Sequence, residues 1–378
     1  SETALKLAQD LIRCPSVTPK TEGVYDVLKS ALEPMGFDCH VLTFKGFEGA
    51  EITNLFARKG TGAPHFCFAG HVDVVPVGDD AAWTSPPFAA EIKDDRLYGR
   101  GTSDMKGNIA CFVAAVAKYL ENNTPAGSIS LLITGDEEAE AINGTVKVLE
   151  WMEEQGQLPD FTLVGEPSNP ESLGEEMKIG RRGSLTGHLK VKGTQGHVAY
   201  PQLADNPMPR MVRLLDALVS YEFDQGNEHF PATNLEISTI DTGNKADNVI
   251  PAQTEAHFNI RFNSNWTAAT LDARVREVLN SVTNRYELTC ISNAEAFITQ
   301  PSATTDMIIG AIRDITGKTP EQTTRGGTSD ARFVAQYGDV VEFGLVNKTI
   351  HKTDEHIEVA DLHTLTDIYA LILERYFS

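Results

Sequence analysis

Cysteine is scarce in this sequence, and its pattern excludes two kinds of structure. The 378 residues include five cysteines, an odd number, and no two of them form a C-x-x-C pair. They are Cys14, Cys39, Cys67, Cys111 and Cys290. A disulfide framework or a zinc ribbon needs paired or closely spaced cysteines. We therefore expect free thiols in a reducing compartment, which indicates a cytoplasmic protein.

Positive charge and long apolar runs are also in short supply. Lysine and arginine number 32 against 53 aspartates and glutamates, so the formal net charge is -21. This charge disfavours nucleic acid or an anionic membrane surface as a partner. The longest apolar helix expected, Ile109–Leu120, is too short to span a bilayer and contains Lys118. No basic-then-apolar leader opens the sequence.

The order of apolar segments predicts an α/β fold with an insertion. A chain of 378 residues is long for a single core, so two domains are expected. Up to about Gly180, buried strands alternate with helices, which is typical of a sheet covered by helices on both faces. Residues 183–293 instead have the alternating pattern of half-exposed antiparallel strands. We expect a discontinuous catalytic domain over residues 1–182 and 294–378, interrupted by that α+β insertion.

Polar residues follow several of the predicted strands at the point where each one ends. In Phe66–Pro76, His71 and Asp73 are two positions apart, so their side chains share one face of a strand. Ligands of open α/β sheets bind beyond the carboxyl ends of the strands. The other polar residues in such positions, or isolated near the C-terminus, are Asp104, Glu137, Glu138, Glu166 and His351.

Each of these residues has an ordinary explanation when it is considered alone. A single histidine near a strand end is more often a core or surface residue than a ligand. Asp104 could cap a helix that starts at Met105, and Glu137-Glu138 could form a solvated acidic turn. The joint pattern of two histidines with several carboxylates favours a metal site. One carboxylate shared between two ions would give each zinc the nitrogen and oxygen ligands that it prefers.

The motifs then resemble a known family. H-x-D, G-R-G-x-x-D-x-K-G, D-E-E, G-E-P and a late I-H occur in the same order in the di-zinc metallopeptidase family that includes aminoacylase, acetylornithine deacetylase and glutamate carboxypeptidase. The resemblance extends along nearly the whole chain. It implies a di-zinc aminopeptidase-like α/β/α catalytic domain with an inserted, ferredoxin-like dimerisation domain. It also implies two zinc ions per subunit, with cobalt as an alternative in one position.

The resemblance also implies a role for each polar residue. His71, Asp104 and Glu166 would hold one zinc, and His351, Glu138 and the bridging Asp104 would hold the other. Asp73 would fix the tautomer of His71. Glu137 would act as the general base when a zinc-activated water molecule hydrolyses an amide.

Further motifs point to the substrate and to a second chain. Gly180–Ser184, Gln195–Pro201, Asn248–Pro251, Gly326–Asp330 and Thr349–Lys352 indicate an N-acyl amino acid that carries several carboxylates. The implied substrate-binding residues are Arg181, Tyr200, Asn248, Arg261, Gly327, Thr328 and Asn347. In the family the insertion forms a twofold dimer, which implies that His197 reaches the partner's active site. A different deacylase or dipeptidase of this family, or a non-catalytic binding protein on the same fold, remains an alternative.

Overall fold

The computed structural model describes residues 2–45 and 50–378, and they divide into two compact units. Unit 1 contains the residues up to Ile179 together with Thr299–Thr323 and Ser329–Ser378. Unit 2 contains Gly180–Ile298 and the short segment Thr324–Thr328. The insertion predicted at residues 183–293 lies inside unit 2. In the described residues, none of the helices combines the length and apolar character that crossing a membrane requires.

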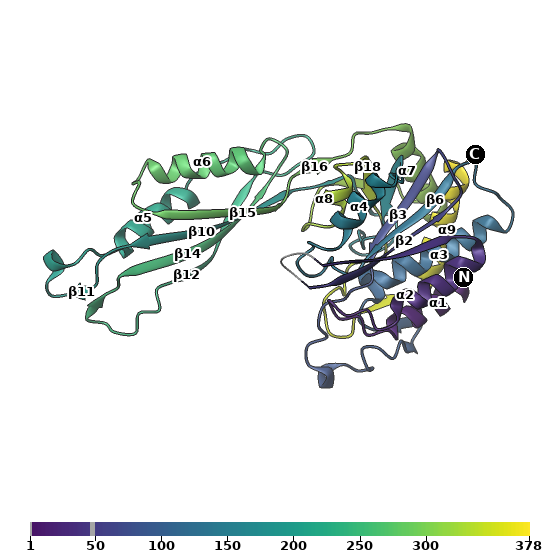
Figure 1. Cartoon of the computed structure of the whole chain (residues 1–378), viewed down its shortest axis with the longest axis horizontal. Helices are drawn as coiled ribbons and strands as arrows, with labels where there is room; N and C mark the ends of the chain where they lie inside the picture. The colour runs from purple at the N-terminus through teal and green to yellow at the C-terminus, as the bar shows by residue number, and fades with distance from the viewer. Residues whose placement is uncertain (1, 46–49) are drawn as a thin grey trace. The chain divides into compact units, whose positions relative to one another are not determined.

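Unit 1 is built on one mixed sheet of eight strands (Figure 1). Their order is β1 (Asp38–Phe44), β2 (Ile52–Lys59), β6 (Ser128–Thr134), β3 (His65–His71), β7 (Phe161–Val164), β18 (Asp339–Glu342), β8 (Glu176–Lys178) and β17 (Glu321–Thr323). The four central strands β6, β3, β7 and β18 run parallel. Every residue of β3, β6 and β7 is buried, which explains their continuous apolar sequences. Their carboxyl ends therefore meet at one edge of the sheet.

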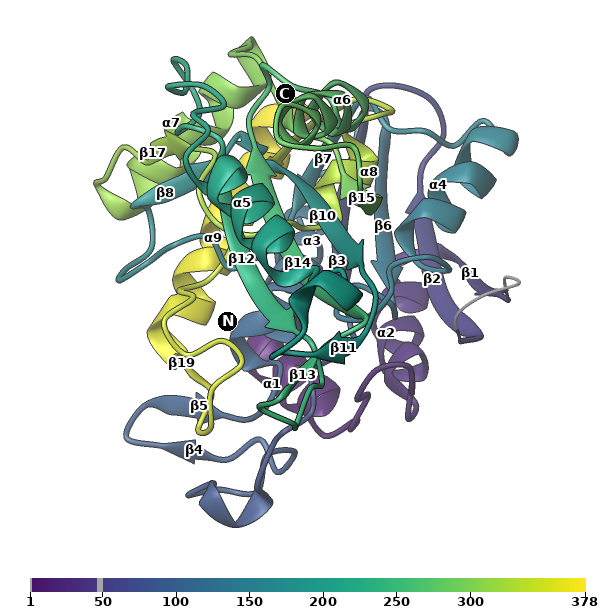
Figure 2. The same ribbon diagram turned by 90° about the vertical axis from the view of Figure 1, so that its left-hand side faces the viewer.

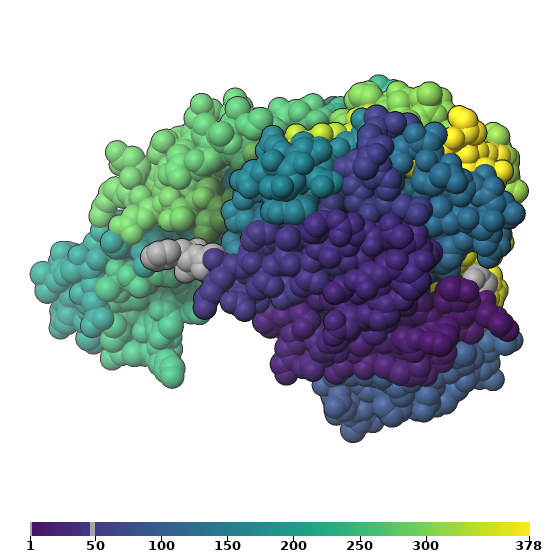
Figure 3. All heavy atoms as spheres, turned by 45° about the vertical axis from the view of Figure 1, so that its right-hand side comes forward, coloured from purple at the N-terminus to yellow at the C-terminus, as the bar shows by residue number. Residues whose placement is uncertain are grey.

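Helices cover both faces of this sheet, so the predicted α/β class is confirmed. One packed group consists of α1 (Glu2–Ile12), α3 (Gly107–Leu120), α7 (Ala303–Thr316) and α9 (Val359–Tyr376). On the other side α4 (Thr145–Glu154) packs on α8 (Ala331–Val334). Helix α2 (Val24–Leu32) packs beside α1 and also contacts β1 and β2. In Figure 3 the N-terminal part of the chain, in purple, forms a continuous region of the unit 1 surface. Phe68 stacks on Phe112 of α3 at 4.3 Å between ring centroids, which joins strand to helix.

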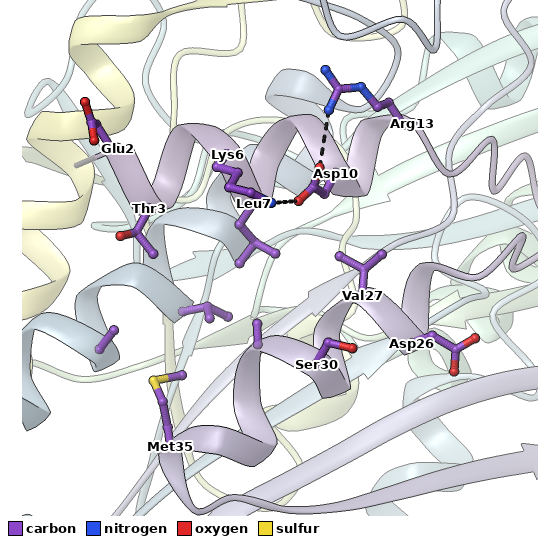
Figure 4. Close-up of a pocket in the computed structure, with 13 residues that line it drawn as sticks. Glu2, Thr3, Lys6, Leu7, Asp10, Arg13, Asp26, Val27, Ser30 and Met35 are labelled. Carbon is purple, nitrogen blue, oxygen red and sulfur yellow. Dashed lines mark hydrogen bonds and ion pairs between the residues drawn. The ribbon is translucent and has the colours of Figure 1, made fainter.

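A groove of about 1030 Å³ lies on unit 1 between α1, α2 and α3 (Figure 4). Leu7, Val27 and other apolar side chains line it. At its rim, Asp10 pairs with Lys6 at 2.6 Å and with Arg13 at 3.3 Å. None of the polar residues predicted at the strand ends lines this groove, so it is separate from the predicted metal site.

A small sheet of three strands was not predicted. It consists of β4 (Ile92–Lys93), β5 (Arg96–Tyr98) and β19 (His356–Glu358). The strands are two or three residues long, too short for a periodic sequence signal. Because β19 pairs with β5, the sheet joins the segment before Asp104 to the segment after His351.

Unit 2 is an antiparallel sheet with two helices on one face (Figure 2). The strand order is β12 (Asn234–Asp241), β14 (Gln253–Phe262), β10 (Gly183–Lys192) and β15 (Glu287–Ala294), and the helices are α5 (Met208–Val219) and α6 (Ala268–Asn280). Alternate residues of β10 and β14 face the helices and form one apolar core with them. Two short pairs complete the unit: β9 (Gly180–Arg181) with β16 (Phe297–Ile298), and β11 (Gly196–His197) with β13 (Val249–Ile250).

Two glycines of β10 make room for aromatic rings of β14. Gly187 is opposite Phe258 and Gly183 is opposite Phe262 in the strand register. A Cβ atom built on either glycine would lie 2.1 Å from the facing ring. Both phenylalanines are fully buried in the core of unit 2. The glycines are therefore required by packing rather than by a turn.

Gly187→Ala should lower the free energy of unfolding of unit 2 by about 1–3 kcal/mol, because the new methyl group displaces the Phe258 ring. Urea denaturation followed by circular dichroism measures this change. Thr289→Val on the exposed face of β15 is the control, and it should change the free energy by no more than about 0.5 kcal/mol. Equal stability of the Gly187 variant and the unsubstituted protein would contradict this account of the packing.

Candidate functional site

The predicted polar residues of unit 1 converge at the carboxyl edge of its sheet. His71 is the last residue of β3 and is 1% exposed. Its Nε2 atom lies 3.1 Å from Asp104 Oδ1 and 3.5 Å from Glu166 Oε1. Glu166 is the second residue after β7, so the ends of two neighbouring strands and the segment before α3 supply these three groups.

The Asp104 carboxylate lies between the two histidines. Its Oδ1 atom faces His71, and its Oδ2 atom lies 3.2 Å from Nε2 of His351. The same nitrogen of His351 lies 2.9 Å from Glu138 Oε1. Each oxygen of Asp104 therefore belongs to a different cluster, which is the arrangement that a bridging carboxylate requires.

Asp104 does not cap a helix, and α3 begins at Gly107 rather than at the predicted Met105. The residues between them are irregular, and Asp104 itself has φ -120° and ψ 91°. The backbone N–H groups of Ser103 and Asp104 donate to the Glu355 carboxylate, which holds the segment in this non-helical conformation. This backbone turns the Asp104 side chain toward the histidines.

Asp73 positions the two glutamates more directly than it positions His71. Its carboxylate accepts hydrogen bonds from the backbone N–H groups of Glu137 at 3.2 Å and Glu138 at 3.0 Å. The Nδ1 atom of His71 lies 2.9 Å from the carbonyl oxygen of Asp73 and 3.6 Å from its carboxylate. The expected hydrogen bond to the side chain is therefore made to the backbone instead. That bond also leaves Nε2 of His71 to face the cluster.

Burial and close charges shift the protonation of this cluster. Hydrogen bonds to Asp104 and Glu138 raise the pKa of His351 to about 10. Burial lowers the pKa of His71, but its hydrogen bond to Asp104 and the charge of Glu166 outweigh burial, so the net shift is upward. Burial likewise raises the pKa of Asp104, but hydrogen bonds to the two histidines bring it below its usual range.

Glu137 is the carboxylate whose environment most favours the protonated form. Burial and the neighbouring charge of Glu166 raise its pKa well above the ordinary value. Its Oε2 atom lies 3.9 Å from Nε2 of His71. Burial also raises the pKa of Asp73, to about 6. A carboxyl group with a raised pKa next to a cation site is suited to accept and return a proton.

The donor set fits divalent metal ions. Within the part of the chain that the structure describes, two groups have ligand atoms within 4.8 Å of one another: His71, Asp104 and Glu138, and His71, Glu137 and Glu166. Imidazole nitrogen with carboxylate oxygen is a ligand set that zinc and similar ions accept. Bound cations would also offset the mutual repulsion of the clustered carboxylates.

The residues predicted to bind substrate are distributed over both units. Asn347 is in unit 1, where its side-chain amide donates to the Pro167 carbonyl oxygen at 3.4 Å, next to Glu166. In unit 2, Nη1 of Arg181 donates to the carbonyl oxygen of Gly327 at 3.1 Å. Thr328 follows Gly327 in the same segment, and Arg261 lies near the end of β14.

A second group of predicted residues lies at the other end of the unit 2 sheet. His197 of β11 packs edge-on against Tyr200 at 5.6 Å between ring centroids. The carbonyl oxygen of Asn248 accepts a hydrogen bond from the backbone N–H of Val198 at 3.1 Å. His197, Tyr200 and Asn248 are all exposed. The structure thus groups these three residues apart from Arg181 and Gly327.

Two neighbours of the metal cluster were not assigned a role from the sequence. Arg100 and Glu355 form an ion pair at 2.8 Å, and they are 2% and 0% exposed. Arg100 belongs to the G-R-G-x-x-D-x-K-G motif, and Glu355 follows His351 by four residues. The position of Arg100 inside a glycine-rich motif was a sequence signal that this arginine has a specific role. Nothing in the sequence indicated which group would pair with it.

Fold and site together define a metal-dependent hydrolase of the aminopeptidase-like α/β class. The chain belongs to peptidase family M20/M25/M40, whose model matches residues 67–375. Curated relatives are similar over the whole chain. One is a succinyl-diaminopimelate desuccinylase of Rhodospirillum centenum, 54% identical over 99% of this chain and 97% of the relative. Another, of the same description, is from Rhodopseudomonas palustris, 53% identical over 100% and 99%. These relatives confirm the family resemblance inferred from the motifs.

Solved structures share the fold at much lower sequence identity. Aminopeptidase PepT from Bacillus cereus has a TM-score of 0.81, with 17% identity over 100% of this chain and 99% of that one. The metallo-carboxypeptidase Sso-CP2 from Sulfolobus solfataricus has a TM-score of 0.79, with 19% identity over 99% of both chains. The YXEP protein of Bacillus subtilis, described as a dinuclear metal-binding peptidase, has a TM-score of 0.70, with 14% identity over 99% and 97%.

Metal binding to the ion-free protein should release protons at pH 8. The pKa of His351, about 10, keeps its imidazole protonated at this pH, and the ring must lose that proton to bind a metal. Calorimetric titration with Zn²⁺ in two buffers of different ionisation enthalpy should therefore show about one proton released by His351, and affinity should rise with pH. His351→Gln should release about one proton fewer. A heat of binding independent of the buffer would contradict this protonation state.

Proposed function

We propose that this enzyme hydrolyses the amide bond of N-succinyl-LL-2,6-diaminopimelate to give succinate and LL-2,6-diaminopimelate, a reaction of lysine and diaminopimelate biosynthesis. The observation that carries the proposal is the full-length similarity, above 50% identity, to several curated desuccinylases. The cluster of two histidines and several carboxylates supplies the chemistry that such a hydrolysis needs. The five cysteines are free in the structure, in keeping with a cytoplasmic location.

Two Zn²⁺ ions are the proposed cofactors, with Co²⁺ as an alternative in one position. His71 and Glu166 would hold one ion, His351 and Glu138 the other, and Asp104 both. The division of the Asp104 oxygens between the two histidines supports this ligand set. Glu137 also lies near His71, but its raised pKa and the contact of Glu138 with His351 favour Glu137 as the base.

The bound ions would supply Lewis-acid chemistry, polarising the amide carbonyl and lowering the pKa of water. Glu137 takes one proton from the water molecule that attacks the amide carbon, and it later gives this proton to the departing amine. Asp73 holds the backbone of Glu137 during both transfers. The C–N bond breaks, succinate leaves with the new oxygen atom, and the amine leaves with the proton.

Arginines of unit 2 are the proposed partners of the substrate carboxylates. Burial lowers the pKa of Arg182, and the positive charge of Arg261 lowers it further. The two guanidinium groups therefore lie near one another. Arg181 is 7% exposed and is held by the Gly327 carbonyl oxygen. A guanidinium group binds a carboxylate with two parallel hydrogen bonds. In a chain with a net charge of -21, such a local group of cations is needed to attract a polyanionic substrate.

Release of amine from N-succinyl-LL-2,6-diaminopimelate, with Zn²⁺ added, tests the proposed reaction. N-acetyl-LL-2,6-diaminopimelate lacks only the succinyl carboxylate, and loss of this one charged hydrogen-bonding group should lower kcat/KM on the order of 10–100-fold. Glu137→Gln should lower kcat on the order of 10²–10⁴-fold and retain both ions, whereas Glu138→Gln should lose one ion. Faster release from the acetyl substrate would contradict the desuccinylase assignment. Loss of an ion only from the Glu137 variant would reverse the roles of the two glutamates.

A homodimer through unit 2 is the second part of the proposal. Strand β10 connects the two groups of predicted substrate residues. Its first residue, Gly183, is two positions after Arg181, and its last residue, Lys192, is five positions before His197. A strand of ten residues spans roughly 30 Å. Arg261 of β14 is opposite Ser184, at the Arg181 end of this strand. One small substrate is shorter than that span, so a single unit 2 does not supply both groups to one active site.

His197 is exposed and has the properties of a hydrogen-bond donor. Its Nδ1 atom accepts a hydrogen bond from the backbone N–H of Ala199 at 3.0 Å, so the neutral ring carries its proton on Nε2. That N–H group is suited to stabilise the negative oxygen that forms as the amide carbon is attacked. In a symmetric dimer the histidine of each chain would serve the site of the other.

The surface of unit 2 supports such a dimer. β12 is an edge strand of its sheet, and unpaired strand edges are sites of association. Exposed apolar side chains lie on β12, on the neighbouring helix α5 and near His197. They are Ile240 (56% exposed), Val212 (63%), Val219 (62%), Tyr200 (56%) and Leu203 (75%). Burial of these groups in a partner would remove unfavourable contact with water.

Two inactive variants should restore activity to one another if His197 acts in the partner's site. Glu137→Ala and His197→Ala are separately dissociated, mixed and reassociated, and amine release is measured. In a mixed dimer, one site has an intact Glu137 and receives an intact His197 from the other chain. About a quarter of all sites should then be complete, because half of the dimers are mixed and each has one complete site. Activity no higher than that of the separate variants would place His197 in its own chain's site, or outside catalysis.

A further inference from the structure

A fully buried carboxylate lies behind the metal cluster and outside the proposed ligand set. Glu355 is 0% exposed, and its two oxygens accept four hydrogen bonds. Oε1 accepts from the backbone N–H groups of Ser103 at 3.0 Å and Asp104 at 3.1 Å. Oε2 accepts from the backbone N–H of Gly101 at 3.1 Å and from Nη1 of Arg100 at 2.8 Å. One side chain thus holds three backbone N–H groups of the segment that leads to Asp104.

Arg100 extends the same interaction to the segment that carries His351. Its Nη1 atom also donates to the carbonyl oxygen of Lys352, the residue after His351, at 3.1 Å. Its Nη2 atom donates to the carbonyl oxygen of Pro76 at 3.3 Å, and its guanidinium carbon lies 5.2 Å from the centre of the Trp83 ring. The arginine therefore contacts two separate segments, residues 76–83 and residues 352–355, which a lysine with its single ammonium group cannot copy.

The pair connects the segments of two proposed ligands that are distant in sequence. Asp104 and His351 lie on different loops, and their side chains meet at 3.2 Å. His351 has φ 58° and a side chain that is 49% exposed, so little packing fixes its position. The backbone of its loop is held by the Arg100 contact at Lys352 and by the hydrogen bond from the Gly99 N–H to the Glu355 carbonyl oxygen at 2.9 Å.

We propose that the buried Arg100–Glu355 ion pair is a positioning pair that sets the distance between Asp104 and His351 and thereby forms the second metal position. The inference rests on the proposed ligand set. The first metal position depends on it less, because His71 is fixed by β3 and Glu166 by β7. Loss of either member should separate Asp104 from His351 while leaving His71 and Glu166 in place.

Metal binding by the ion-free protein tests this role directly, without measuring turnover. Glu355→Gln keeps the size of the side chain but presents an amide N–H₂ where an acceptor is required. Arg100→Lys keeps the charge but loses the contacts to separate loops. Each protein is stripped with a chelator, titrated with Co²⁺ against a competing fluorescent chelator, and analysed for bound metal after gel filtration. The thermal unfolding of each ion-free protein is recorded in parallel with the Co²⁺ titration.

The matched control is a second buried ion pair of unit 1, on β8, whose nearest proposed ligand in sequence is Glu166, ten residues earlier. Lys178 and Glu176 of β8 lie 2.5 Å apart and are 6% and 7% exposed. Glu176→Gln should lower the unfolding temperature, since it leaves a buried ammonium group unpaired. It should still bind two ions with the affinities of the unsubstituted protein. A general loss of stability is thereby distinguished from a specific loss of metal.

Glu355→Gln and Arg100→Lys should weaken the second ion on the order of 10–100-fold, a change common for groups that orient metal ligands, and the first ion less. If Glu355→Gln yields no folded protein, the metal affinities of Arg100→Lys alone test the positioning role. Unchanged affinity for both ions, or equal weakening of both, overturns the positioning role. If the unsubstituted protein itself binds fewer than two ions, the proposed ligand set is wrong, and this inference fails with it.

Discussion

The structure around the site depends on one electrostatic constraint: several carboxylates occupy a small, partly buried volume. Asp104, Glu137, Glu138 and Glu166 all lie within ion-pair reach of an imidazole, and burial and repulsion between like charges work against their ionised forms. The two histidines offset part of this repulsion, and bound cations would offset more. Two other carboxylates near the site, Asp73 and Glu355, accept hydrogen bonds from backbone N–H groups, and Glu355 also pairs with Arg100.

Asp73 and Glu355 show how that stabilisation also positions the cluster. Asp73 accepts from two successive backbone N–H groups after β6, and Glu355 accepts from three in the loop before α3. Hydrogen bonds to a carboxylate are stronger than those between neutral groups. Each of these acids therefore stabilises a loop in one conformation, and that conformation directs Glu137, Glu138 or Asp104 toward the histidines. The same hydrogen bonds thus stabilise the buried charge and fix the positions of the proposed metal ligands.

Unit 2 differs from unit 1, because it contributes no residue to the clusters of possible metal ligands found among residues 2–45 and 50–378. Its core is a regular two-layer arrangement in which Gly183 and Gly187 admit the rings of Phe262 and Phe258. Its predicted substrate-binding residues and His197 lie in two groups near opposite ends of a ten-residue strand. This length separates His197 from Arg261 and is the reason for proposing an active site that draws on two chains.

The sequence alone determined the α/β class, the insertion and the identity of the clustered residues in unit 1. Each buried strand is a continuous apolar run, and the polar residue that ends it is visible because parallel strands place their carboxyl ends together. Only the tertiary structure decided how those residues are held. The partner of Arg100 lies 255 residues away, and no local pattern encodes a hydrogen bond between backbone N–H groups and so distant a carboxylate. For the same reason, the irregular backbone at Asp104 and the bond from His71 to a carbonyl oxygen became apparent only in the folded chain.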